Sequence, residues 1–335
     1  MENKTFDVIK LRFKAPLHIS RGQTNSYDIS EKIIHSDTLK AALFSMAKQI
    51  LPEEVTGDAK RFHESYKVSS AFPFSGSNLF FPKPKVHLPV SIAKMDETEK
   101  AKPLKKVEYI EKAIFEKILN NTHTEIEKEQ LAGQGKYMLS APVNNSFKLT
   151  KSKVEQKVNI PQDRSNDTQP YYIDRIYFEK DAGLFFLFET ENTKIKQHIL
   201  SCLKLLGDEG IGTDRNVGNG LFDFEVENIS FNLPDQFEKL INLSLYLPLK
   251  EELNENQLKQ SAYELVRRGG YIAGTNDNEF LKLRKKQVFM MSEGSVFKSG
   301  TDRKGKIVNL KPEYDGVHDI WRDGTSIFLP LKAEL

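Results

Sequence analysis

The sequence lacks the features of several protein classes. A single cysteine, Cys202, excludes an internal disulfide bond and a cysteine-rich zinc site, and it favours the cytosol. Apolar runs such as GLFFLF at 183–188 fall far short of the roughly 20 residues that cross a bilayer. The opening segment MENKTFDVIKLRF has no apolar stretch typical of a signal peptide. We therefore expect a cytoplasmic protein without a membrane partner.

Motifs for metals and cofactors are also missing. The seven histidines never have H-x-H or H-E-x-x-H spacing, which gives no support to metal-dependent hydrolysis. The sequence has no G-K-[ST] motif of a nucleoside-triphosphate loop. Its one glycine-rich segment has an arginine where the dinucleotide-binding motif G-x-G-x-x-G needs its third glycine. We expect neither a cofactor nor a metal.

The composition is that of a globular protein with balanced charge. Hydrophobic residues make up 39% and charged residues 29% of the sequence, which excludes collagen-like and fully disordered chains. A length of 335 residues favours two domains. Because 49 basic and 47 acidic residues leave a net charge of only +2, any nucleic-acid binding must come from local basic clusters.

Hydrophobic periodicity predicts the main elements of the N-terminal part. Alternating residues over 6–19 predict a strand, and apolar residues at helical spacing predict helices over 38–50 and 193–206. Ser36 and Asp37 directly precede the first helix, and both residue types are typical of a helix N-cap.

Two further segments interrupt this pattern. Residues 96–131 are rich in Lys and Glu and carry spaced apolar residues, which predicts one inserted amphipathic helix. Residues 146–180 have two β-rich arms around the turn-forming sequence PQDRSNDTQP, which predicts a β-hairpin. Lys151, Lys153 and Lys157 alternate along the first arm, so they share one face, as expected of a surface that binds a polyanion.

The C-terminal part repeats the N-terminal order less clearly. We expect a domain boundary near 232–240, a strand over 242–249 and a helix over 254–268. The order strand–helix–strand–strand–helix–strand in both halves is typical of ferredoxin-like folds. The sequence therefore predicts an α+β fold with antiparallel sheets and two domains, 1–232 and 233–335.

The segment 207–220, GDEGIGTDRNVGNG, holds five glycines and a central arginine, Arg215. Glycines allow positive φ angles and close backbone approach, and successive exposed amides form an anion-binding nest. Arg215 would add a bidentate phosphate contact or stack on a base. The alternative is a tight helix-to-strand connection, for which one or two glycines would suffice. We interpret this glycine loop as an element that binds a phosphate backbone.

Several motifs, in this order, resemble one known family. HSDTL at 35–39 opens a helix, and the glycine loop precedes a strand. Between and beyond them stand SAFPF (70–74), FFPKP (80–84), NIPQDRS (159–165), YYIDRIYFEKDAGLFFLF (171–188) and RRGGYIAG (267–274). The set resembles the RAMP superfamily of CRISPR proteins. Within it, the set is most similar to the type III-A (Csm) effector subunit that holds the 5′ end of the crRNA.

The resemblance implies a place in a ribonucleoprotein complex of antiviral defence. Family members have two RRM-like domains and bind the 5′ repeat-derived tag of the crRNA. They dock against the large palm-domain subunit and the first backbone RAMP subunit, and they meet target RNA only indirectly. A projecting β-hairpin thumb distorts the stacking of the guide, and the hairpin at 146–180 matches it in position. The insertion at 96–131 departs from the family pattern.

The residues expected to contact RNA lie in the loop after the first strand, at the start of the first helix, in the hairpin and in the glycine loop. They are His18, Arg21, Ser36, Lys151, Lys153, Lys157, Arg164, Arg175, Gly210, Gly212, Arg215, Gly218 and Gly220.

Two alternatives to a non-catalytic RNA-binding subunit stay open. The first is a metal-independent crRNA-processing endoribonuclease of the same superfamily, in which His18 or His35 would act as the general base. The second is an interaction-only subunit without RNA contacts. We expect no catalytic residue and no enzyme activity.

Overall fold

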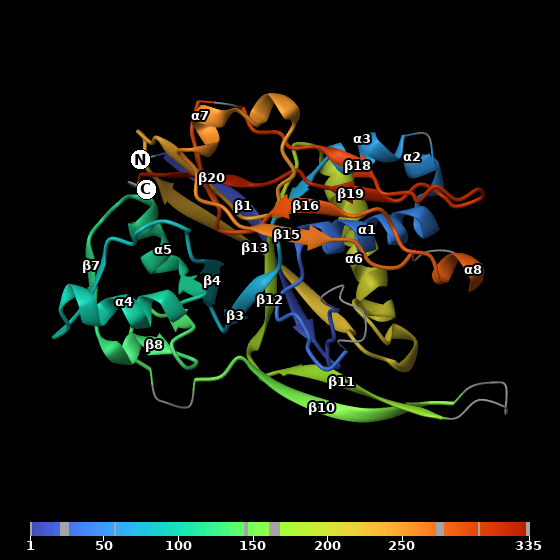
Figure 1. Ribbon diagram of the computed structural model, residues 1–335, viewed down its shortest axis with the longest axis horizontal. Coiled ribbons are helices and arrows are strands. Elements are labelled where there is room, and N and C mark those ends of the chain that lie inside the picture. The colour runs from blue at the N-terminus through green and yellow to red at the C-terminus, as the bar shows by residue number, and fades with distance from the viewer. Residues whose placement is uncertain are drawn as a thin grey trace.

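A mixed α/β architecture organises the chain (Figure 1). The computed structural model describes residues 2–20, 27–56, 58–143, 147–160, 168–272, 278–300 and 302–332. The helices are α1 (Ser36–Ile50), α2 (Pro52–Thr56), α3 (Ala59–Glu64), α4 (Glu97–Lys106), α5 (Lys112–Leu119), α6 (Thr193–Glu209), α7 (Glu255–Leu258) and α8 (Asn278–Leu281). None of the helices in the described ranges is long and apolar enough to cross a membrane.

The largest sheet has the strand order β13-β1-β12-β3-β4-β6-β9-β8, and β2 also pairs with β12. Its first four strands are all antiparallel to their neighbours. The strands are β1 (Glu2–Phe13), β2 (Lys67–Val68), β3 (Phe72–Ser75), β4 (Asn78–Pro82), β6 (Tyr109–Glu111), β8 (Leu131–Ala132), β9 (Tyr137–Met138), β12 (Ala182–Glu189) and β13 (Phe222–Leu233).

Strand β12 is the apolar run of the sequence, and it is buried on both faces of this sheet. Leu184 and Phe186 pack with α1 and α6, which lie side by side on one face (Figure 1). Phe185 and Leu187 pack on the opposite face, in a cluster that contains residues of α5 and of the C-terminal half. A strand covered on both faces needs apolar residues at every position, which explains why β12 does not alternate.

The C-terminal half consists of short strands and two one-turn helices. Its strands are β14 (Lys239–Asn242), β15 (Leu265–Arg268), β16 (Val288–Met291), β17 (Val296–Lys298), β18 (Ile307–Asn309), β19 (Trp321–Asp323) and β20 (Phe328–Leu331). β14 lies between β17 and β20, whereas β15–β16 and β18–β19 form two-stranded ribbons. Ile241 and Leu329 belong to the same buried cluster as Val8 of β1, so the two halves share one core.

The predicted hairpin is present. Strands β10 (Thr150–Asn159) and β11 (Gln169–Phe178) pair antiparallel over their whole lengths and project from the body of the protein (Figure 1). The predicted helices over 38–50 and 193–206 are confirmed as α1 and α6.

Four predictions of elements were wrong. The strand over 242–249 shares only Asn242 with β14, and the rest of it holds one isolated bridge, between Tyr246 and Met291. The insertion is not one helix, because Tyr109–Glu111 pairs with β4 and β9 and separates α4 from α5, while β5 (Val90–Ile92) pairs with β7 (Thr124–Ile126). The helix over 254–268 ends at Leu258, because Leu265–Arg268 pairs with β16 instead. The strand over 6–19 ends at Phe13, shortly before Pro16, which cannot donate to a ladder.

A buried cluster of ion pairs connects the start of α1 to the C-terminal half. The Asp37 carboxylate, whose side chain has no exposed surface, accepts hydrogen bonds from Arg268 Nε at 2.8 Å and from Arg322 Nη1 at 2.5 Å. Burial alone would raise the pKa of the Asp37 carboxyl, but the charges of Arg268 and Arg322 outweigh burial and hold the pKa far below its usual value. The carboxylate is therefore charged at every physiological pH.

A second buried pair lies further along α1. Lys40 Nζ donates to Asp323 Oδ2 at 2.6 Å and to the carbonyls of His63 and Tyr66, each at 2.7 Å. Burial alone would raise the pKa of the Asp323 carboxyl, but the charge of Lys40 and the nearby His63 ring, whose Nδ1 lies 3.6 Å from Asp323 Oδ2, outweigh it and hold the pKa at about 2. Lys40 and Asp323 thus join the same helix to β19.

Asp37→Asn should destabilise the protein by about 3–5 kcal/mol, because it leaves two arginines buried without a counter-charge. Urea unfolding measures this loss. The matched control is Glu255→Gln, which removes one carboxylate from an exposed pair with Lys259 and should cost about 0–1 kcal/mol. Equal losses in the two variants would contradict the structural role of Asp37.

Stability should fall as the pH drops from about 4 to about 2, because Asp323 is ionised in the folded state down to a pKa of about 2 and takes up a proton at about 3.9 when unfolded. This difference contributes about 2 kcal/mol that is present above pH 4 and lost in acid. Urea unfolding at a series of pH values should give a flatter profile for Asp323→Asn than for the wild type. A profile of unchanged slope would contradict the prediction.

Candidate nucleic-acid interface

The glycine loop connects α6 to β13 through five residues with positive φ angles, four of them glycines. Helix α6 ends at Gly210, whose φ is 84°. Asp214, with a φ of 61°, and Gly218, with a φ of 83°, flank a single 3-10 turn over Arg215–Val217. Positive φ favours glycine, and aspartate is among the few other residues that accept it. The loop is therefore a defined structure that presents Arg215 at its apex.

Four of its glycines are needed for close backbone approach, and one of them is Gly207, where a Cβ atom would lie 2.5 Å from the carbonyl oxygen of Phe222. A Cβ atom at Gly220 would lie 1.9 Å from the carbonyl oxygen of Ile211, and one at Gly210 would lie 2.3 Å from that of Asn219. A Cβ atom at Gly212 would lie 2.4 Å from the carbonyl oxygen of His18. Steric need therefore explains these positions without a ligand.

The expectation of a nest of exposed amides requires correction. The amides of Gly210, Gly218 and Gly220 donate to the carbonyls of Leu206, Arg215 and Pro16, at 2.7, 2.9 and 2.9 Å. An amide that already donates within the protein cannot also cradle a phosphate. In contrast, Arg215 is exposed. At these three positions the loop therefore offers no amide to an anion, whereas the Arg215 guanidinium is available.

The hairpin has one cationic face. Lys151, Lys153 and Lys157 of β10 stand opposite Tyr177, Arg175 and Tyr171 of β11 in the register, and residues opposite each other project to the same side. The three lysines therefore share a face, as the alternation in the sequence predicted. The exposed side chains of Val154, Val158 and Tyr172 occupy alternate positions and belong to the opposite face.

Carboxylates neutralise part of this cationic face. Lys153 Nζ lies 3.1 Å and Arg175 Nη1 lies 3.3 Å from the Glu155 carboxylate. The hydrogen bond from Lys153, with the charge of Arg175, lowers the pKa of the Glu155 carboxyl. Lys157 Nζ lies 3.3 Å from Asp214 Oδ2. This last pair joins the hairpin to the glycine loop, so two segments that the sequence analysis treated separately form one surface.

His18 joins the same two segments from inside. Its side chain is buried, and Nδ1 donates to the carbonyl of Asp174 in β11 at 2.7 Å. Its own carbonyl accepts a hydrogen bond from Thr213 N at 2.9 Å. The Asp174 carboxylate in turn accepts from Ser30 N at 3.1 Å and from Ser152 Oγ. The expectation that His18 contacts RNA is corrected: it has no exposed surface and holds the end of β1, the hairpin and the glycine loop together.

Ser36 is also misassigned as an RNA contact and as an N-cap. His35 is the N-cap residue of α1, and Ser36 is buried. The Ser36 hydroxyl accepts a hydrogen bond from Leu245 N at 2.9 Å, and its amide donates to Ser70 Oγ at 2.9 Å. The hydroxyl thus contacts the C-terminal half, and the amide is bonded within the N-terminal half. Arg21 and Arg164 lie outside the described residues.

Asp174, Asp214 and Tyr27 were missed by the sequence analysis. The Tyr27 carbonyl accepts from Asp174 N at 2.8 Å, and the Tyr27 ring lies 6.2 Å from that of Tyr171. Asp174 had a detectable signal, because an acidic residue in the middle of the apolar strand sequence YYIDRIYF must find a buried partner. Asp214 and Tyr27 carry no comparable signal.

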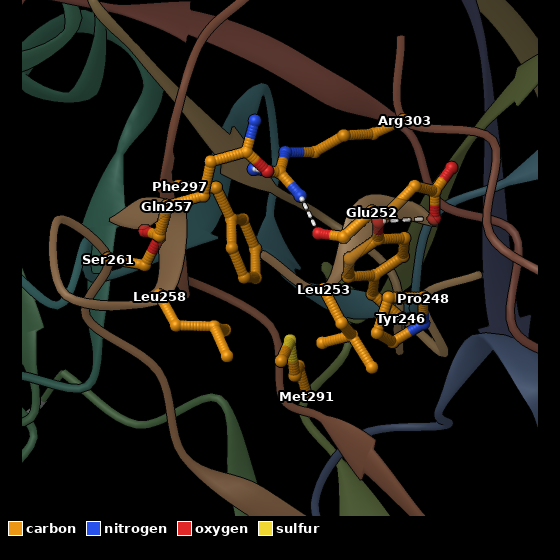
Figure 2. A pocket seen from close by; sticks show the side chains of 10 residues that line it. All are labelled: Tyr246, Pro248, Glu252, Leu253, Gln257, Leu258, Ser261, Met291, Phe297 and Arg303. Carbon is orange, nitrogen blue, oxygen red and sulfur yellow. Dashed lines mark hydrogen bonds between the residues drawn. The ribbon is translucent and has the colours of Figure 1, made fainter. Parts of the chain in front are cut away.

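One hollow lies in the C-terminal half, and a groove lies between segments of the N-terminal and C-terminal halves. The first, shown in Figure 2, has an empty volume of about 180 Å³, and Tyr246 Oη donates to the Glu252 carboxylate at 2.7 Å on one of its sides. This space includes open solvent and leaves no room for an enclosed water molecule, whereas ligand pockets begin at roughly 300 Å³. The second is a groove of about 950 Å³ between the segments 82–87 and 261–264. No group of three or more potential metal ligands occurs in the described part of the chain.

Comparison with known proteins identifies relatives of the whole chain. Residues 235–331 match the CRISPR Csm4 C-terminal domain. The chain is 26% identical over 278 residues to the Csm4 protein of Thermococcus onnurineus, covering 80% of this chain and 82% of the relative. It is 21% identical to the Csm4 protein of Methanocaldococcus jannaschii, covering 98% and 97% of the two chains.

Solved structures have the same fold. A chain of the Csm3–Csm4 subcomplex of the type III-A CRISPR-Cas interference complex aligns with a TM-score of 0.65 and 20% identity, over 98% of this chain and 100% of that one. A chain of the Csm1–Csm4 cassette in complex with pppApA aligns with a TM-score of 0.62 and 20% identity, over 98% of both chains. With a match to the Csm4 C-terminal domain over residues 235–331 and Csm4 relatives along its length, the chain is similar to the Csm4 proteins of CRISPR systems.

Proposed function

We propose that the chain is a non-catalytic RNA-binding scaffold subunit of a type III-A CRISPR interference complex, and that it caps the 5′ repeat-derived tag of the crRNA. The observation that carries the proposal is the Lys157–Asp214 contact, which joins a projecting cationic hairpin to a loop with an exposed arginine. Similarity to Csm4 proteins over 80% and 98% of the chain supports the assignment to this complex. In this proposal the hairpin acts as the thumb that reaches onto the guide.

The proposed architecture is two RRM-like domains, 1–232 and 233–335. In the first domain, the antiparallel order β13-β1-β12-β3 with α1 and α6 on one face is the arrangement expected of a ferredoxin-like unit. The corresponding unit in the second domain would be reduced, because its strands are short and α7 and α8 have four residues each.

The proposed partners follow from the relatives. Chains of the same fold were solved in a Csm1–Csm4 cassette and in a Csm3–Csm4 subcomplex. We therefore assign this chain to the junction between the large palm-domain subunit and the first backbone RAMP subunit. Target RNA would meet it only through the guide.

The proposed RNA contacts are side chains rather than loop amides. Arg215, Lys151 and Lys153 are exposed and carry the positive charge that phosphates need. Lys157 and Arg175 are half-buried and paired with carboxylates, so they would have to exchange partners to bind phosphate. Tyr172, 53% exposed on the opposite face of the hairpin, offers a ring on which a base can stack. The RNA contacts of Arg21 and Arg164, which lie outside the described residues, stay predictions.

The endoribonuclease alternative is not favoured. A general base must come within hydrogen-bond reach of the substrate hydroxyl. His18 has no exposed surface, and His35 Nδ1 lies 2.8 Å from the Glu293 carboxylate inside the protein. Neither residue that was considered as a base lies on the proposed RNA surface.

Arg215→Ala should weaken binding of a 5′-tag RNA by about tenfold or more, because a charge-assisted hydrogen bond contributes about 1.5–3 kcal/mol. Filter binding measures the affinity, and a thermal melt should show no change in folding because Arg215 is exposed. Arginine is a better probe than the glycines, since substituting Gly210, Gly212 or Gly220 would disturb the backbone.

The matched control for Arg215 is Lys204→Ala, which removes one positive charge from the exposed surface of α6, where Lys204 pairs only weakly with Asp208. It should leave the RNA affinity unchanged. Unchanged affinity in a folded Arg215→Ala variant would exclude the glycine loop as the tag site.

Replacing Lys151, Lys153 and Lys157 together by Ala should flatten the dependence of log affinity on log salt by up to about two units. Each phosphate contact on a single strand contributes about −0.7 to this slope. Native and scrambled guide RNAs should be weakened by similar factors, because phosphate contacts carry no sequence information. Fluorescence titration at several salt concentrations gives the slopes.

Lys180→Ala is the control, because it removes an exposed lysine just after β11, outside the cationic face of the hairpin. We expect a slope close to that of the wild type. If the triple variant keeps its salt slope and loses complex assembly instead, the lysines contact a neighbouring subunit and not RNA.

A further inference from the structure

The cluster around Asp37 holds more positive than negative charge. Arg268 and Arg322 both bind the Asp37 carboxylate, and one carboxylate can neutralise only one of them. Arg322 is 6% exposed, and its Nε atom is buried without a hydrogen-bond partner among the described residues. A buried N–H group without an acceptor destabilises a protein. A hydrogen-bond acceptor placed at Arg322 Nε would therefore stabilise this site.

Lys285 adds a third cation to the same cluster. It lies between α8 and β16, where its amide donates to the carbonyl of Gly270 at 3.0 Å. Its side chain is close enough to Arg322, Asp37 and Arg268 to interact with their charges. No ion pair or hydrogen bond of its ammonium group is found within the described part of the chain, although neighbouring Lys286 pairs with Glu313 at 3.0 Å.

Asp37 is the carboxylate that bonds to Arg268 and Arg322 in this Lys285 cluster, and the charges of Glu293 and Glu31 also act on Arg268. Burial, with the charge of Arg322, lowers the pKa of the Lys285 ammonium to about 8. Cations gathered in a half-buried place are unfavourable unless an anion joins them. The protein side chains that face Lys285 from α1, β15 and β19 provide only Asp37, whose two oxygens already accept hydrogen bonds from both arginines and from Thr38.

We propose that Lys285, with Arg322 and Arg268, forms a binding site for a phosphate group, separate from the glycine loop and the hairpin. Guanidinium and ammonium groups in one cluster are the donors that bind phosphate in proteins. Lys285 is half-buried rather than enclosed, so a ligand can reach it from solvent. The phosphate would belong to the backbone of the bound RNA, a reading that rests on the proposed function, or to a free phosphate compound.

The first test uses inorganic phosphate and the full chain. At about pH 7, phosphate should raise the melting temperature above that in chloride of equal ionic strength. Lys285→Gln should weaken phosphate binding by about tenfold or more, because one charge-assisted bond is lost. The control Lys282→Gln, an exposed lysine of the same segment, should behave as the wild type. Absence of stabilisation in the wild type, or equal stabilisation of Lys285→Gln, would overturn the proposal.

A pH series separates this site from non-specific binding. Lys285 loses its proton around its pKa of about 8, so the phosphate effect should fade by about pH 9 in the wild type. The arginines stay charged over this range. A phosphate effect that persists unchanged at this pH would mean that Lys285 does not bind the anion.

The source of the phosphate is decided with 5′-tag RNA. If the site holds the RNA backbone, Lys285→Gln weakens RNA binding and inorganic phosphate competes with RNA. If Lys285→Gln loses phosphate binding but keeps full RNA affinity, the site takes a free phosphate compound. In that second outcome the phosphate-binding site is confirmed, and the proposed tag site is tested by the Arg215→Ala variant alone.

Discussion

The Asp37 carboxylate is the interaction on which the arrangement of the chain depends. It lies at the start of α1, yet both of its guanidinium partners come from the C-terminal half, from β15 and β19. A charge buried this completely is tolerated only with its partners in place. The Lys40–Asp323 pair repeats the connection further along the helix. Together with the shared apolar core, these pairs fix α1, and through it the central sheet, against the second half.

That fixed frame determines where the cationic surface can form. Strand β1 leads directly to His18, which is buried and bonded to Asp174 of the hairpin and to Thr213 of the glycine loop. Helix α6, packed on α1, ends at the same loop. The polar contacts of His18 and the Lys157–Asp214 pair then set the position of the hairpin relative to Arg215. Buried groups build this surface, and only exposed side chains remain available for RNA.

The sequence predicted the elements whose signals are local. Helices α1 and α6, strand β12 and the hairpin follow from periodicity and turn residues, and the lysine face follows from spacing alone. Predictions failed where distant partners decide the structure: Leu265–Arg268 is a strand because β16 lies beside it, and Tyr109–Glu111 interrupts the insertion because it pairs with β4. The glycine loop was located correctly, but its amides bond within the protein, which spacing cannot reveal.

The central claim is that the hairpin and the glycine loop together hold the 5′ tag of the crRNA. Crosslinking tests it most directly, with a reconstituted complex whose crRNA carries a photoreactive nucleotide within the tag, followed by peptide mapping. The account predicts crosslinks to the peptides that contain residues 151–157 and 210–220. Crosslinks confined to other parts of this chain, or to other subunits only, would contradict it.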